Sequence, residues 1–89
     1  MIHQKITVTG RVQGVSFRYY TQQKARELGL CGFVRNMDNG DVYIEVEGEP
    51  ELLQKFNAWC EKGPRLARVD NLKIEEAAAR DFKEFEILR

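Results

Sequence analysis

The order of the periodic segments constrains what this chain can fold into more than any other feature of its sequence. Residues 5–12 alternate apolar and polar side chains, which is the two-residue period of a half-buried strand, and residues 17–28 carry apolar side chains at helical spacing. Strand patterns recur at 32–37 and 42–47, and the Asp-Asn-Gly turn signal at 38–40 joins them as a hairpin. The chain is therefore expected to begin as strand, helix, strand, strand.

A second helix and two more strands complete this order. Pro50 suits a helix start, because the N–H group that proline lacks would have no partner there. The helix is expected to end at Gly63-Pro64 and to carry one apolar stripe of Leu52, Leu53, Phe56, Trp59 and Cys60. Residues 69–74 then predict a fourth strand, with either a bulge or a late start where the alternation slips in phase. Residues 76–81 predict a loop, and 85–87 predict a short last strand.

The order β-α-β-β-α-β with a short extra C-terminal strand predicts an α+β sandwich of the ferredoxin-like type. Two right-handed crossovers that share one sheet place both helices on the same face of an antiparallel or mixed sheet. A length of 89 residues is enough for one such domain, spanning 1–89, but not for two.

The charge balance argues against binding partners that would be attracted by an overall net charge of the protein. The 14 basic and 14 acidic residues give a formal net charge of zero, so neither nucleic acid nor an anionic membrane is expected to bind. No apolar run approaches the ~20 residues that cross a bilayer, and the N-terminus lacks a signal-peptide core. We expect a cytoplasmic monomer. Cys31 and Cys60 lack metal-ligand spacing and are expected to be free thiols. A structural disulfide between them is the alternative if the chain is exported.

The segment Gly10-Arg11-Val12-Gln13-Gly14-Val15-Ser16-Phe17-Arg18 joins the first strand to the first helix. A glycine-bracketed loop that leads into a helix directs free backbone N–H groups, and the positive end of the helix dipole, at one anion. Arg18 can close over that anion, and Ser16 is expected to be the N-cap. The segment predicts a phosphate-sized site, although the glycines alone could simply relieve crowding.

Two spaced motifs resemble the signatures of the acylphosphatase family. The segment 10–18 is similar to the first signature, and Gly32-Phe33-Val34-Arg35-Asn36, followed by Gly40, Val42 and Gly48, is similar to the second at each defined position. The similarity continues through Gly63-Pro64 to Phe85-Glu86-Ile87 and thus spans almost the whole chain. Two motifs in the right order within the expected topology are far more specific than either motif alone.

The resemblance implies hydrolysis of acyl phosphates to a carboxylate and inorganic phosphate, without a metal or a cofactor. By motif position, Arg18 corresponds to the family's substrate-binding arginine and Asn36 to the asparagine that holds the attacking water. Met37 departs from the small polar residue that often follows this asparagine, which affects the rim of the site. The family's phosphate cradle, where inorganic phosphate or sulfate would also bind, corresponds to the backbone amides of Gln13, Gly14, Val15, Ser16, Phe17 and Arg18.

The residue types themselves fit such chemistry. An acyl phosphate has a good leaving group, so positioning and electrostatic stabilisation are the main demands, and an arginine binds phosphate oxygens bidentately. Asn36 is neutral and is expected to orient a water rather than to act as a base. The sequence has no nucleophile elbow, no Cys-x5-Arg loop and no carboxylate cluster for a metal. His3, the only histidine, is expected to face solvent or to pack.

Two other functions stay open at this point. The open face of a sheet with this topology can bind RNA, which requires exposed aromatic side chains and a basic surround. The run Gly32-Phe33-Val34 faintly echoes such a motif, whereas Glu45 and Glu47 argue against it. The second alternative is an idle anion-binding or regulatory module, since acylphosphatase-like domains also occur fused to larger carbamoyl-transferring enzymes. The presence of both Arg18 and Asn36 favours an enzyme, and Arg65 and Arg68 are interpreted as surface charge.

Overall fold

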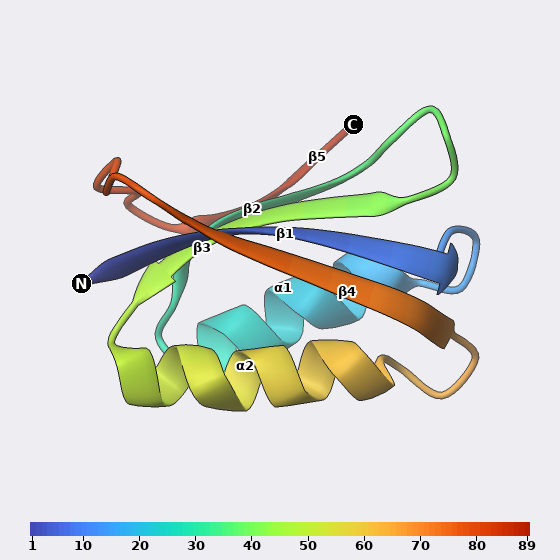
Figure 1. The fold of residues 1–89 in the computed structure, drawn as a ribbon, viewed down its shortest axis with the longest axis horizontal. Helices are drawn as coiled ribbons and strands as arrows, with labels where there is room; N and C mark the ends of the chain where they lie inside the picture. The colour runs from blue at the N-terminus through green and yellow to red at the C-terminus, as the bar shows by residue number, and fades with distance from the viewer.

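The computed structural model describes all 89 residues and contains five strands and two helices in the predicted order. Both helices lie on one face of a five-stranded sheet with the strand order β4-β1-β3-β2-β5, which confirms the ferredoxin-like sandwich (Figure 1). The elements are β1 (Ile2–Arg11), α1 (Phe17–Glu27), β2 (Cys31–Asn36), β3 (Val42–Gly48), α2 (Pro50–Lys62), β4 (Arg68–Ala77) and β5 (Phe85–Leu88).

The sheet is mixed because its last strand pairs in parallel. β1 pairs antiparallel with β3 and β4, and β2 pairs antiparallel with β3, whereas β5 runs parallel to β2. The predicted bulge in β4 is confirmed by a register shift opposite Thr9 and Gly10. The backbones approach so closely there that a Cβ on Gly10, whose φ is 139°, would overlap the carbonyl oxygen of Arg68. Only glycine fits this position without moving a strand.

One core of 15 buried residues fills the space between the sheet and the helices. Pro50 begins α2 as predicted, and the helix turns Leu53, Phe56 and Cys60 into the core. Burial raises the pKa of the Cys60 thiol well above its usual range. Cys60 and the half-buried Cys31 are both free thiols, as expected. Neither helix has the length and apolar character needed to cross a membrane.

Helix α1 ends as predicted but begins differently. At its C-terminus the N–H of Leu30 donates to Ala25 O, and the N–H of Gly29 donates to Arg26 O, which is the Schellman arrangement. At its N-terminus Ser16 has a φ of 60°, in the left-handed region, and its side chain makes no capping hydrogen bond. Ser16 therefore occupies the N-cap position as predicted, but its side chain does not cap the helix, because capping needs an extended backbone that turns the hydroxyl back toward the first helical turn.

The segment 78–84 crosses the sheet on the face opposite the helices, because it links the two edge strands β4 and β5 (Figure 1). The predicted loop began at residue 76, but β4 continues to Ala77, which pairs with His3. Beneath the crossing segment, both ring nitrogens of His3 lie 2.8 Å from carboxylate oxygens, Nε2 from Glu45 and Nδ1 from Glu47. His3 and Glu47 are almost fully buried, so of the two expected placements for His3, facing solvent or packing, the structure shows packing.

The crossing segment also argues against an RNA-binding face on this side of the sheet. The backbone N–H groups of Arg80 and Phe82 donate to the two carboxylate oxygens of Glu47 and hold the segment against the sheet. The Phe82 ring packs edge-on against Phe33 with the ring centroids 5.8 Å apart. Phe33 and Tyr43 are consequently half-buried, whereas RNA recognition needs aromatic faces that are open for stacking.

Candidate active site

Three strands that point in the same direction end at one edge of the sheet. β1 and β2 both run antiparallel to β3, and β5 runs parallel to β2, so the carboxyl ends of all three lie at that edge. There β1 leads into the loop before α1, β2 ends at Asn36, and β5 ends at Leu88. The topology therefore gathers segments from the beginning, the middle and the end of the sequence.

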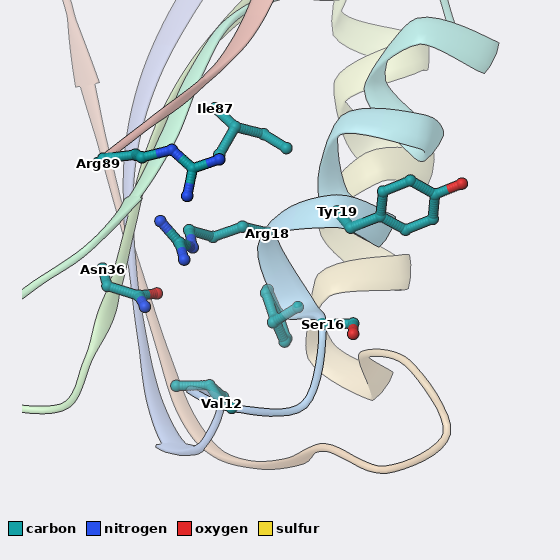
Figure 2. Close-up of a pocket in the computed structure, with 9 residues that line it drawn as sticks. Val12, Ser16, Arg18, Tyr19, Asn36, Ile87 and Arg89 are labelled. Carbon is teal, nitrogen blue, oxygen red and sulfur yellow. The ribbon is translucent and has the colours of Figure 1, made fainter.

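An open cavity of about 500 Å³ lies where these segments meet. Figure 2 shows the side chains of Arg18, Asn36 and Arg89 converging in it, with Val12 and Ser16 at one end and Ile87 and Arg89 at the other. Its lining residues are Val12, Gly14, Ser16, Phe17, Arg18, Tyr19, Asn36, Ile87 and Arg89. The structure thus brings Arg18 and Asn36, the two residues expected to carry the chemistry, into one cavity.

The loop before α1 offers a row of free backbone donors. None of the N–H groups of residues 13–19 donates a hydrogen bond within the protein, and the first helical bond runs from the N–H of Tyr20 to Ser16 O, at 3.1 Å. A φ of 74° at Gly14 and of 60° at Ser16 lets the chain turn sharply into the helix. Gly14, Ser16, Phe17 and Arg18 line the cavity, so this wall combines free N–H groups with the positive end of the helix dipole.

Gln13 and Val15, the other two residues predicted for the cradle, are not part of the cavity wall. The Val15 side chain is buried in the core. Gln13 Nε2 instead donates to Met37 O at 2.8 Å and to Asp41 O at 2.9 Å, both in the hairpin that follows Asn36. The Gln13 side chain therefore ties the loop to the strand that carries Asn36, and it fixes the separation of the two sides of the cavity.

Replacing Gln13 with alanine is expected to lower the free energy of unfolding by about 2 kcal/mol, because two carbonyl groups lose their donor at once. Binding of inorganic phosphate should also weaken, because the loop loses its attachment to the hairpin. Urea titration and calorimetry check the two effects. Gln23→Ala is the matched control, since Gln23 is exposed on α1 and makes no side-chain hydrogen bond. Equal stability and phosphate affinity in the two variants would contradict this role.

Arg18 reaches the cavity from the first turn of α1, and the guanidinium end of its side chain is held by a hydrogen bond. Its Nη1 donates to Leu88 O at 3.2 Å, a contact between residues 70 positions apart in the sequence. This bond leaves the other guanidinium N–H groups of Arg18 for a ligand. The last strand therefore orients the arginine that the first motif supplies.

Arg89, Ile87, Tyr19 and Val12 line the cavity but were not predicted from the sequence. For Arg89 a signal existed in the alternation of the last strand, in which Phe85 and Ile87 face the helices. The parallel register pairs Arg35 with Leu88, which puts Asn36 and Arg89 at the next matching positions of β2 and β5. Finding Arg89 required knowing that β5 pairs with β2, and no motif indicates this pairing.

The cavity carries positive charge without an acidic neighbour. Arg18 and Arg89 are its two charged side chains, and no acidic, histidine or cysteine side chain lines it. No cluster of such side chains in the chain has the makeup of a metal site. Two guanidinium groups, a neutral amide and a row of free N–H groups form an arrangement that favours an anion with several oxygen atoms.

The family model and the curated relatives indicate one family. The model of the acylphosphatase family matches residues 4–87. An acylphosphatase of Vibrio vulnificus (strain CMCP6) is 47% identical over 85 residues, which cover 96% of this chain and 94% of that protein. The crystal structure of an acylphosphatase from Bacillus subtilis covers all of both chains with a TM-score of 0.97 and 36% identity. Full-length HypF, in its phosphate- and nucleotide-bound form, matches 99% of this chain over 12% of its own, at 30% identity and a TM-score of 0.89.

Proposed function

The chain belongs to the acylphosphatase family and is an acylphosphatase enzyme, and from this premise we propose that it hydrolyses acyl phosphates by direct attack of a water molecule positioned by Asn36. The observation that carries the proposal is the convergence of Arg18, Asn36 and the free N–H groups of the loop on one cavity. Residues 1–89 act as one domain in this proposal, and no second copy is needed because one chain lines the whole cavity.

The transferred phosphoryl group binds between the loop and Arg18. The backbone amides of the loop residues that line the cavity, Gly14, Ser16, Phe17 and Arg18, donate to its oxygen atoms, and the Arg18 guanidinium donates from the other side. These donors match the demand of phosphoryl transfer, in which negative charge is spread over the equatorial oxygens of the transition state. Because the donors are held by the fold before the substrate arrives, little reorganisation is needed during the reaction.

Asn36 accepts a hydrogen bond from the attacking water through its amide oxygen and holds it in line with the bond that breaks. A P–O bond forms to the water while the P–O bond to the acyl group breaks, and the electron pair of that bond leaves on the carboxylate. The proton of the water ends on a phosphate oxygen or in solvent. A carboxylate is a stable leaving group, so neither a general acid nor a metal is needed to assist its departure.

Replacing Asn36 with alanine is expected to lower kcat for benzoyl phosphate by about 10²-fold with a small change in KM, because misplacing the nucleophile affects the transition state more than binding. The loss of benzoyl phosphate absorbance with time measures both constants. Asn39→Ala in the neighbouring hairpin turn is the control, since Asn39 does not line the cavity. A variant at position 36 with normal kcat and an intact fold would remove Asn36 from the mechanism.

The mechanism as a whole is tested with water carrying a heavy oxygen isotope. Direct attack on phosphorus places the label in inorganic phosphate, leaves none in the carboxylate, and gives no covalent phosphoenzyme on rapid quenching. Turnover should persist in EDTA, and inorganic phosphate should inhibit competitively. Label in the carboxylate or a trapped phosphoenzyme would overturn the mechanism. Wild-type protein that binds phosphate without turning over acyl phosphates would favour the idle anion-binding module instead.

A further inference from the structure

Arg89 places a second guanidinium group in the cavity, and the mechanism above gives it no task. It follows β5, whose Leu88 carbonyl oxygen already anchors Arg18. In the cavity the loop forms one end, Arg18 lies in the middle, and Arg89 enters beside Ile87 from the opposite end with its guanidinium directed toward Arg18 (Figure 2). A phosphoryl group that fills the loop therefore leaves Arg89 facing the rest of the substrate.

The Arg89 side chain forms no ion pair with an acidic side chain of the protein. The cavity contains no acidic side chain, and Arg18 is its nearest charged neighbour in the lining. The ion pairs of the chain involve other basic residues: His3, Lys24, Arg68, Lys73 and Arg80. Two guanidinium groups that share one cavity repel each other, and an anion with two negatively charged ends would satisfy both.

Resting on the proposed function, we infer that Arg89 determines specificity by binding a second anionic group on the acyl part of the substrate. The favoured substrates are acyl phosphates whose acyl chain ends in a carboxylate or a similar oxyanion. The phosphate end binds to the loop and Arg18, and the distal oxyanion binds to Arg89. Ile87 and Tyr19, which also line the cavity, contact the carbon chain between the two charged ends.

Three substrates that share one chromophore test this inference: benzoyl phosphate and its meta- and para-carboxy derivatives. The carboxylate of these rigid acids cannot cyclise onto the acyl group. The meta and para isomers place it at two different distances from the phosphate. Arg89→Gln is expected to lower kcat/KM roughly tenfold for at least one carboxy derivative and less than twofold for benzoyl phosphate, the loss of one charge-assisted bidentate contact. The inhibition constant of inorganic phosphate should stay the same.

Matched variants separate this contact from other effects. Arg65→Gln removes the same charge from an exposed residue outside the cavity and should leave the ratio of the kcat/KM values unchanged. Arg89→Lys should recover part of the selectivity, because it keeps the charge but loses the bidentate geometry. Unchanged ratios in Arg89→Gln for both isomers would overturn the inference. An equal loss on all three substrates with weaker phosphate inhibition would also overturn it, by placing Arg89 on the transferred phosphate.

A binding experiment gives a result even if the proposed hydrolysis fails. Calorimetry compares benzylphosphonate with its para- and meta-carboxy derivatives, none of which can be hydrolysed. Tighter binding of a carboxy derivative that is lost in Arg89→Gln and kept in Arg65→Gln supports the second anion site whether or not the wild type turns over acyl phosphates. No difference between the two variants would overturn the site, while turnover of benzoyl phosphate by the wild type would still support the proposed function.

Discussion

Replacing Arg18 with glutamine is expected to lower kcat/KM for benzoyl phosphate by about 10³-fold, which corresponds to about 4 kcal/mol of lost transition-state stabilisation. Arg18 is the only charged group that the proposal places on the transferred phosphoryl group. Its guanidinium binds the phosphate in the ground state and the more widely spread charge of the transition state, so KM should rise and kcat should fall together. The steady-state constants from the absorbance assay measure both changes.

Two further variants make the Arg18 result specific. Arg18→Lys keeps the charge but loses the planar fork, so most of the loss should remain. Arg35→Gln removes a charge one residue before Asn36, from a side chain that lies over the Tyr43 ring outside the cavity, and should leave kcat/KM almost unchanged. Circular dichroism has to show an intact fold in each case. Nearly full activity in a folded Arg18→Gln protein would remove Arg18 from the proposed site.

Replacing His3 with alanine is expected to lower the free energy of unfolding by about 3–5 kcal/mol at neutral pH, because it leaves two buried carboxylates without their shared partner. The His3 side chain is fully buried, and those of Glu45 and Glu47 are 8% and 2% exposed. Both short contacts are hydrogen bonds when the ring carries both protons, since ionised carboxylates only accept. Denaturant titration with an independent thermal melt measures the loss.

The same cluster predicts how stability depends on acid. Burial raises the pKa of Glu47, but the N–H groups of Arg80 and Phe82 and the His3 ring lower it by more, and the net pKa lies below its ordinary value. The pKa of Glu45 is lowered too: burial alone would raise it, but Tyr43 and His3 oppose that. Carboxyls with a lowered pKa stabilise the fold above about pH 4.5, their ordinary value, and lose this effect as the pH falls.

The difference in stability between wild type and His3→Ala should therefore be largest near neutral pH and should shrink as both carboxyls become protonated. Gln4→Ala is a control on the same strand that removes a polar side chain without touching this cluster. Glu47→Gln should also weaken the attachment of segment 78–84. The N–H groups of Arg80 and Phe82 donate to separate carboxylate oxygens of Glu47, and the glutamine amide offers only one acceptor oxygen. A stability difference that does not vary with pH would assign the loss at His3 to packing alone.

The sequence and the structure differ most where the outcome depends on long-range pairing. Arg18 and Asn36 were predictable because each stands at a fixed place in a local motif, next to a turn or a helix start. Arg89 was not, because its position follows from the parallel pairing of β5 with β2. For His3 the sequence left open whether the side chain faces solvent or packs, since no local motif reveals that segment 78–84 covers it.

Local backbone conformation was a second feature that the sequence did not predict. Ser16 has the side chain of an N-cap and stands at the right position, yet its left-handed backbone prevents that role. Positive φ angles at Gly14 and Ser16 turn the loop sharply into the helix where it borders the cavity. Where backbone N–H groups form the wall of a site, the backbone conformation decides whether a side chain such as that of Ser16 can cap the helix, and the residue type alone does not predict it.

The contact between Arg18 and Leu88 also links the arrangement of the candidate active site to a late step of folding. These residues are 70 positions apart, and they meet only after the chain has crossed the whole sheet and β5 has docked beside β2. Closing so long a loop is among the slower steps of folding. During refolding, the return of activity is therefore expected to follow the docking of β5 beside β2 rather than the earlier collapse of the core.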